Sequence, residues 1–595
     1  MAKPSPSPHK PRRKAKHAVD SPSTFHSSGS IETLSRAPTF PLEAFLWPAR
    51  GTASQWELLP LILMAVGLFR WAAGLWGYSG FEKPPMFGDY EAQRHWMEVT
   101  TQLPISQWYF HDLEWWGLDY PPLTAYHSWL CGKIGSLIDP SWFALFSSRG
   151  SHDPTLKVFM RATVIVSEYL VYIPAVVVFV RRYSRLNGVV YWSAAVALVA
   201  ILMQPATILI DHVHFQYNTV MLGFVVASMS SMLAGRNLWA AVFFVAALGF
   251  KQMALYYACS VFAYLLGSCV FPRLNLPRLV AIAAVTAVSF AILLLPVVLG
   301  TLVDVRHGID SRPGLDGPRP PLPLFQWLAD HLDTEASYYP VVEQIVQIIH
   351  RIFPFARGLF EDKVANFWCA LNVVVKIKKY PAELLRRWAL VATLISIIPP
   401  NLVLFLRPRR ELLPLAFATT AWGFFLFSYQ VHEKSVLLPL MPMTLLLASS
   451  HGLKNTTRSW VGFANILGCW TMFPLLQRVG LAVPYAVLTL LWAYLLGLPP
   501  TSLSTYFHGG RRSWTQLATF LIHGSFYMAM ALWHVLAHFI RPPRDKPDLW
   551  VVANVGVGAA GFSLCYLWCL LRLLVQGEIL PRSWFVKKDK VKKTQ

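Results

Sequence analysis

The chain has 595 residues, of which 55% are hydrophobic and only 14% are charged, and its formal net charge is +21. This apolar balance excludes an ordinary water-soluble protein and predicts an all-α polytopic membrane protein, because lipid offers a spanning backbone no hydrogen-bond partner outside its own helix. The basic excess would suit a nucleic-acid-binding protein, but the basic residues gather beside apolar segments, as they do in cytosolic segments of membrane proteins. We therefore expect membrane lipid and no nucleic acid as a partner. The basic runs are Arg181, Arg182 and Arg185, then Arg273 and Arg278, then Arg511 and Arg512, and both chain ends.

The first 50 residues are rich in proline, serine, lysine and arginine and lack the apolar core of a signal peptide. We expect residues 1–50 to form a disordered, basic cytosolic tail. A first transmembrane module follows at 51–303. Its first apolar run leads out of the cytosol, so residues 79–157 form a first long lumenal loop.

Apolar runs of about 20 residues, the length needed to cross a bilayer, recur along the chain and give about 14 spans with alternating sides. In the first module we expect spans at 57–78, 158–180, 188–210, 217–235, 237–252, 253–271 and 278–303. In a C-terminal module, residues 388–580, we expect spans at 388–406, 412–429, 435–450, 459–477, 482–498, 515–540 and 549–575. A second basic cytosolic tail follows at 581–595.

A second long lumenal loop covers residues 304–387. Its apolar stretch 364–375 is too short to cross by itself and is interpreted as re-entrant or interfacial. If that stretch did cross, His432 would lie on the other side of the membrane from Asp89. The preferred arrangement leaves five basic residues lumenal, against the charge rule. These are Lys376, Lys378, Lys379, Arg386 and Arg387.

Residues 87–96 of the first loop, FGDYEAQRHW, place six polar or ionisable side chains directly after a predicted span. A solvated loop and a functional site are both open interpretations. Gly88 permits tight backbone geometry ahead of Asp89 and Glu91, and the flanking aromatic side chains suit contact with sugars or with the membrane interface. We therefore treat Asp89 as the candidate catalytic residue.

Three other groups of ionisable residues have a structural and a functional interpretation. Asp119, before Tyr120 and two prolines, is better explained as a fixed turn than as a catalytic residue. Metal ligation is only weakly suggested by Asp211, His212 and His214. Together with Gln216, these residues are better explained as a hydrogen-bonded lumenal rim. Arg161 and Glu168, seven residues apart within a span, predict an intrahelical ion pair.

The segment 430–435, QVHEKS, brings His432 and Lys434 between two predicted spans. Solvation of a loop explains this pair, but cationic donors at the membrane surface would also hold a phosphate headgroup. The seven cysteines lie mostly in apolar runs without paired spacing, so they predict neither a disulfide framework nor a zinc site.

Six segments, in order, carry a family resemblance: GDYEAQRHWMEVT, WGLDYPPLTAYHS, IDHVHFQYN, FKQMALYY, FEDKVANFWC and FSYQVHEKS. They resemble the lumenal α-1,3-glucosyltransferases of the endoplasmic reticulum that use dolichyl phosphate glucose, and long ordered motifs are far more specific than one short pattern. The QRHW and WWGLDYPPLTA forms are most similar to members that add the first glucose to Man9GlcNAc2-PP-dolichol. Sister members that add the second glucose to Glc1Man9GlcNAc2-PP-dolichol remain an alternative.

The resemblance implies a GT-C fold in the endoplasmic reticulum membrane, with a lumenal active site, cytosolic termini, no cofactor and no metal. Asp89 matches the family's catalytic aspartate and would accept the proton of a mannose 3-hydroxyl. Because a β-linked phosphate donor gives an α-linked product, the reaction requires inversion by one direct displacement. The donor phosphate would be bound by His432, with Lys434 and Arg94 as further candidates. The substrate pocket would comprise Glu91, His95, Trp96, Asp119, Tyr120, His212, His214 and Gln216.

A transporter or lipid flippase is a competing class, because many spans and membrane carboxylates fit either one. Transporters often contain two related halves, and no internal repeat is evident here. The C-terminal Lys592-Lys593-Thr594-Gln595 resembles a dilysine retrieval signal, although a simple basic cytosolic end explains it about as well.

Overall fold

The computed structural model describes residues 37–51, 54–310, 327, 330–334, 336, 338–353, 363–507 and 514–581. Most of both predicted basic tails lies outside the described residues. The part of the N-terminal tail that is described is helical, with α2 at Pro41–Leu46. Phe40 and Leu42 are buried in the core, and the Arg458 guanidinium lies 4.2 Å from the Phe40 ring centroid. The predicted disorder up to residue 50 therefore extends too far, because these apolar side chains anchor the segment.

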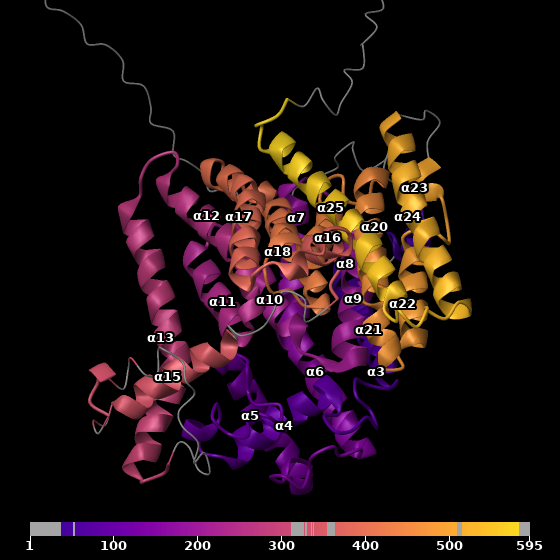
Figure 1. The fold of residues 1–595 in the computed structure, drawn as a ribbon. Coiled ribbons are helices and arrows are strands. Elements are labelled where there is room, and N and C mark those ends of the chain that lie inside the picture. The colour runs from indigo at the N-terminus through magenta and orange to yellow at the C-terminus, as the bar shows by residue number, and fades with distance from the viewer. Residues whose placement is uncertain are drawn as a thin grey trace, which may run out of the picture.

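Throughout the described residues the regular elements are helices, with short 3-10 turns between some of them (Figure 1). The first half contains α3 (Gln55–Gly74), α4 (Gly88–Gln102), α5 (Pro122–Ile138), α6 (Pro154–Leu170), α7 (Tyr172–Leu186), α8 (Tyr191–Leu202), α9 (Pro205–Thr207), the π-helix η4 (Ile208–Phe215), α10 (Asn218–Leu233), α11 (Asn237–Phe250), η5 (Gln252–Tyr257), α12 (Ala258–Val270) and α13 (Leu276–Arg306). The second half contains α15 (Tyr339–Ile352), α16 (Phe367–Val375), α17 (Ala382–Leu406), α18 (Leu413–Phe427), α19 (Leu437–Leu445), α20 (Asn455–Thr471), α21 (Phe473–Arg478), α22 (Ala482–Leu495), α23 (Ser504–Phe507), α24 (Trp514–Phe539) and α25 (Leu549–Gln576).

Nine helices within the described ranges are long and apolar enough to cross a membrane. They are Glu57–Gly74, Pro154–Leu186, Tyr191–Phe215, Gln252–Val270, Leu276–Arg306, Ala382–Leu406, Asn455–Arg478, Trp514–Phe539 and Leu549–Gln576. Three shorter apolar helices, α10, α11 and α22, accompany them. The prediction of an all-α, many-span membrane protein is therefore confirmed, whereas the count of fourteen stays a prediction.

The stretch 364–375 does not form a spanning helix. Its helix, α16, has 9 residues, which is less than half the length that a crossing needs. Trp368 Nε1 donates to the carbonyl oxygen of Phe427 at 2.8 Å, so α16 is fixed against the end of α18. The helix is therefore too short to cross by itself, and its re-entrant or interfacial position stays a prediction.

The described parts of the two long segments predicted as loops are largely helical and pack on each other. Helices α4 and α5 of the first segment lie together at one end of the helix bundle, beside α15 of the second (Figure 1). Gln347 Nε2 donates to the Tyr109 carbonyl at 2.9 Å, and Arg351 Nη2 donates to the Gly117 carbonyl at 2.8 Å. These side-chain bonds join segments more than 200 residues apart in sequence into one cap over the bundle.

A buried ion pair fixes the helices below this cap, but its members differ from those predicted. Glu168 accepts from Arg70 Nε at 2.8 Å and lies 2.5 Å from His212 Nε2, with Arg70 and Glu168 fully buried. Arg161 instead donates to the carbonyls of Gly77 and Val213, at 3.0 and 2.9 Å. The predicted Arg161–Glu168 pair is wrong because seven residues separate these side chains by about 10 Å along a helix, whereas neighbours on one face are three or four residues apart.

Candidate active site

Asp89 lies in the first turn of α4, where the chain enters the helix through an unusual backbone conformation. Phe87 and Gly88 both have positive φ, 52° and 67°. A Cβ atom at Gly88 would lie 2.9 Å from the backbone of Ser79, so only glycine fits this close approach. The Ser79 hydroxyl accepts from the amide of Tyr90 at 3.3 Å. The glycine that precedes the acidic pair thus sets the position of Asp89.

Three side chains from distant segments converge on the Asp89 carboxylate. Lys434 Nζ and Gln216 Nε2 both donate to Oδ2, the latter at 2.5 Å, and His214 Nδ1 lies 3.6 Å from the same oxygen. Burial by itself would raise the pKa of Asp89. The positive charge of Lys434, with smaller effects of His214 and His432, outweighs burial and holds the pKa below its ordinary value. Asp89 is therefore an anion across the whole range of physiological pH.

A chain of hydrogen bonds continues from Asp89 into the bundle. Asn218 Nδ2 donates to Gln216 Oε1 at 2.8 Å, and Lys251 Nζ donates to Asn218 Oδ1 at 2.6 Å. The Lys251 ammonium also lies 4.6 Å from the ring centroid of Tyr120. Gln216 cannot rotate away from Asp89 without breaking this network, so its amide is held with the nitrogen toward the carboxylate.

Asp89 opens onto a cavity of about 790 Å³. Its walls come from the start of α4, from residues 116–120, from the segment after η4, from the α11–η5 junction, from the end of α15, and from residues 429–435. Among the charged residues that line it, four are lysine or arginine and two are aspartate: Lys251, Arg351, Arg386, Lys434, Asp89 and Asp119. Basic side chains therefore outnumber the two carboxylates in the lining, which suits a phosphate-bearing substrate.

The cavity brings together seven of the residues proposed from sequence. They are Asp89, Trp96, Asp119, Tyr120, Gln216, His432 and Lys434. His214 lies behind Asp89 and contacts its carboxylate. His432 Nδ1 accepts from the amide of Lys434 at 3.2 Å, and this bond stiffens the turn that carries the lysine.

Arg94, Glu91 and His95 lie elsewhere, within the body of α4. The Arg94 guanidinium is fully buried and bonds to Glu91 at 2.7 Å, to Glu98 at 2.6 Å and to Ser148 at 2.6 Å. Burial would raise the pKa of Glu98, but the hydrogen bond from His95 and the charge of Arg94 lower it to about 2. With its donors occupied in this way, Arg94 is placed to hold α4 against residues 142–148 and not to bind a donor phosphate.

The Asp211, His212 and His214 side chains point to different partners. Asp211 accepts from Asn218 Nδ2 at 2.8 Å, His212 pairs with Glu168, and His214 faces Asp89. In the described part of the chain, no three His, Cys, Asp or Glu side chains are grouped as a metal site. A π-helix, η4, carries all three residues, and its wider turn directs them to separate neighbours.

Sequence reasoning missed three basic residues that line the cavity, Lys251, Arg351 and Arg386. Lys251 belongs to the FKQMALYY segment quoted above, where its position just before a span was a usable signal. In the sequence, Arg386 stands out only as an exception to the charge rule. Its guanidinium lies 5.7 Å from the Tyr429 ring centroid, at the cavity wall.

Comparison with known proteins decides the family. The model of the ALG6, ALG8 glycosyltransferase family matches residues 61–308 and 332–571, which is most of the chain. The chain belongs to this family of glycosyltransferases. All the residues that line the Asp89 cavity fall within the two matched segments.

Curated relatives of the family align over nearly their full length. A Schizosaccharomyces pombe protein named as a probable dolichyl pyrophosphate Man9GlcNAc2 alpha-1,3-glucosyltransferase is 42% identical over 92% of this chain and 98% of its own. The Saccharomyces cerevisiae protein named as the same glucosyltransferase is 41% identical over 90% of this chain and 95% of its own. The Gallus gallus protein of that name is 36% identical over 85% of this chain and 95% of its own. Membership of this family favours a transferase over the transporter or flippase considered from sequence.

Proposed function

We propose that this chain transfers glucose from dolichyl phosphate glucose to the 3-hydroxyl of a terminal mannose of Man9GlcNAc2-PP-dolichol, with inversion at the glucose carbon. The acceptor and the α-1,3 linkage are those in the names of the relatives. The observation that carries the proposal is an ionised Asp89 opening onto a basic cavity at one end of a membrane-spanning bundle. Such a site offers a base to a hydroxyl and positive charge to a phosphate.

Asp89 acts as the general base. It accepts the proton of the mannose 3-hydroxyl while the hydroxyl oxygen bonds to C1 of glucose and the C1–O bond to dolichyl phosphate breaks. The proton stays on Asp89 Oδ, and the electron pair of the broken bond leaves with the phosphate. A single displacement at the opposite face of C1 converts the β-linked donor into an α-linked product.

Lys434 couples the base to the leaving group. In the free protein its ammonium pairs with Asp89. A donor phosphate in the cavity competes with Asp89 for that ammonium. When Lys434 is shared between the phosphate and Asp89, it neutralises less of the Asp89 charge. The pKa of Asp89 then rises towards a useful basicity at the moment when donor is bound. His432, Arg351 and Arg386 supply the remaining donors around the phosphate, which leaves without a general acid.

The same proposal includes the surroundings of the site. The fold is GT-C, with about 14 spans, in the membrane of the endoplasmic reticulum; the Asp89 end faces the lumen and both termini face the cytosol. The chemistry requires no metal, because lysine, arginine and histidine balance the phosphate charge. Support comes from the basic runs near Arg181 and Arg273, which lie at the ends of helices away from the Asp89 cavity, as the charge rule expects for cytosolic segments.

The experiment is incubation of the purified protein with dolichyl phosphate glucose and two lipid-linked acceptors, one ending in Man9GlcNAc2 and one already carrying one glucose. We expect transfer to the first acceptor only, with an α-1,3 linkage in the product. Preference for the glucosylated acceptor would assign the chain to the sister reaction, and transfer to neither would contradict the proposal.

A further inference from the structure

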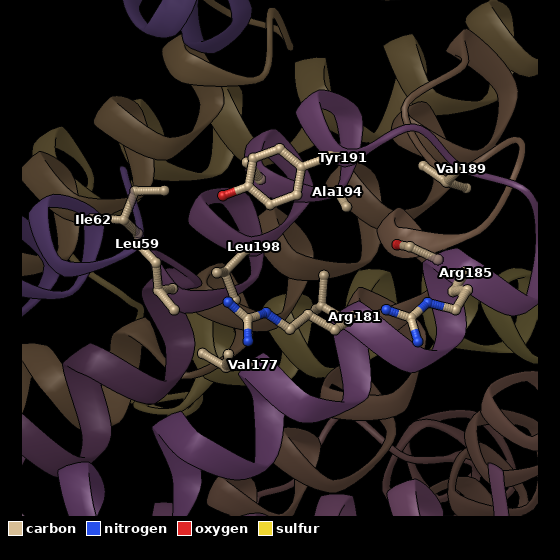
Figure 2. A pocket seen from close by; sticks show the side chains of 12 residues that line it. Leu59, Ile62, Val177, Arg181, Arg185, Val189, Tyr191, Ala194 and Leu198 are labelled. Atoms are coloured by element: carbon tan, nitrogen blue, oxygen red, sulfur yellow. The ribbon is translucent and has the colours of Figure 1, made fainter. Parts of the chain in front are cut away.

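A second cavity, of about 330 Å³, lies between helices α3, α7 and α8. Figure 2 shows its lining: Leu59 and Ile62 on one side, and Arg181, Arg185 and Tyr191 on the other. The guanidinium of Arg181 and the hydroxyl of Tyr191 both point into the space next to Leu59 and Ile62. An apolar wall therefore faces a polar, positively charged one.

This cavity lies at the end of the bundle opposite Asp89. Arg161 is hydrogen-bonded to Gly77, just after the end of α3 that approaches the Asp89 cavity. Arg181 comes twenty residues later on the nearly continuous helix Pro154–Leu186, which corresponds to about 30 Å at 1.5 Å per residue. That length equals the thickness of a hydrocarbon core. Arg181 therefore lies at the opposite surface of the membrane, while Leu59 and Ile62 lie within the apolar layer of that leaflet.

Arg181 and Arg185 differ in their hydrogen bonds from Arg182, which lies between them in the sequence. Arg182 donates to the carbonyl of Ser230 at 2.8 Å and does not line the cavity. Arg181 and Arg185 are exposed, and neither forms an ion pair or hydrogen bond with any residue that the structure describes. Arg181 interacts electrostatically with Tyr191, whose hydroxyl is a further donor. Two positive charges thus converge on the cavity, and among the described residues that line it there is no carboxylate to balance them.

We propose that this cavity binds one anionic glycerophospholipid of the leaflet opposite Asp89. Its phosphate takes donors from Arg181, Arg185 and Tyr191, and one acyl chain lies along Leu59, Ile62 and Val177. Charge complementarity requires an anionic headgroup, since each arginine near an anionic membrane surface attracts it. The apolar wall requires a chain, because a free phosphate would leave it uncovered. The site is distinct from the glucose-transfer cavity and from its substrates.

The test measures binding of phosphatidylserine to the purified full-length protein in detergent, with phosphatidylcholine and inorganic phosphate as comparison ligands. We expect phosphatidylserine to bind more tightly than either. In the double variant Arg181→Gln/Arg185→Gln its affinity should fall about 25-fold, which is about fivefold for each arginine. Arg182→Gln, which removes one positive charge at the neighbouring position, should leave the affinity within about twofold, since a contact outside the cavity contributes little.

A second variant separates loss of the lipid-binding cavity from misfolding of the protein. Leu59→Trp fills the apolar wall and leaves both arginines in place, so phosphatidylserine binding should weaken while the thermal stability of the lipid-free protein is retained. A loss of about fivefold in Arg182→Gln, as large as the loss expected for each arginine of the cavity, would show general attraction of anionic lipid and overturn the proposal. Binding of inorganic phosphate as tight as that of phosphatidylserine would also overturn it, because the acyl chain would then contribute nothing.

Discussion

Lys434 and Asp89, 345 residues apart in sequence, form an ion pair at the wall of the large cavity. The two residues come from the two halves of the chain, so the candidate site exists only when both halves are folded against each other. Lys434 is 11% exposed and Asp89 24%, and both remain reachable from the cavity. A ligand that enters the cavity therefore meets the base and its cation together.

Replacing Lys434 tests this coupling. Lys434→Gln should lower kcat/KM for the donor about 100-fold to 1000-fold, the usual effect of removing one preorganised electrostatic group. Asp89 must be ionised to act as the base, and loss of the positive charge raises its pKa. The acidic limb of the pH profile of kcat/KM therefore moves to higher pH. Lys434→Arg keeps the charge and should keep the limb where it is. A Gln variant whose limb does not move would show that Lys434 does not control Asp89.

His432 is proposed to donate to the phosphate. His432→Ala should raise KM for dolichyl phosphate glucose about tenfold or more, because a hydrogen bond to a charged group contributes about 1.5–3 kcal/mol. The KM for the lipid-linked acceptor should stay unchanged. Steady-state kinetics with each substrate varied in turn separates the two, and unaltered donor kinetics would remove His432 from the phosphate site.

Gly88 sets the position of Asp89 through its positive φ and its contact with Ser79. Gly88→Ala should strongly reduce glucose transfer, because the new Cβ must displace the Ser79 backbone and with it the first turn of α4. Gly188 is the matched control, with φ of 65° and open space around it. Gly188→Ala carries only the conformational strain, about 1–2 kcal/mol, and should retain activity. Equal activity in both variants would show that the close approach at Gly88 does not matter.

Arg70 and Glu168 hold α3, α6 and η4 together beneath the site. Arg70→Met leaves Glu168 buried without its main partner and should destabilise the protein by about 3–5 kcal/mol. The double variant Arg70→Met/Glu168→Leu removes both charges and should recover much of that loss. Thermal unfolding of the detergent-solubilised variants measures the difference, and a double variant less stable than either single one would contradict a simple ion pair.

Local sequence signals predicted the main features of the fold and the core of the site. Apolar runs have a length dictated by the bilayer, so the many-span helical class followed directly, and Gly88 before Asp89 indicated tight geometry that the structure contains. The partner of Glu168 was mispredicted because helix spacing alone reports neighbours within one helix, whereas Arg70 reaches it from another. Arg386 was missed because only folding brings it to the wall of the Asp89 cavity, and Lys251 was missed although its position just before a predicted span marked it. Arg94 matched a functional motif yet is occupied by Glu91 and Glu98, a distinction that needs three-dimensional contacts.

The most direct test of the central claim is glucose transfer by Asp89→Asn. Asparagine keeps the size of the side chain and its hydrogen bonds but cannot accept a proton as a carboxylate does. The variant, purified and shown to be folded by its thermal unfolding, is incubated with dolichyl phosphate glucose and Man9GlcNAc2-PP-dolichol. We predict loss of transfer by at least about 100-fold, with donor binding retained. Transfer at the rate of the unmodified protein would contradict the role of Asp89 as the base.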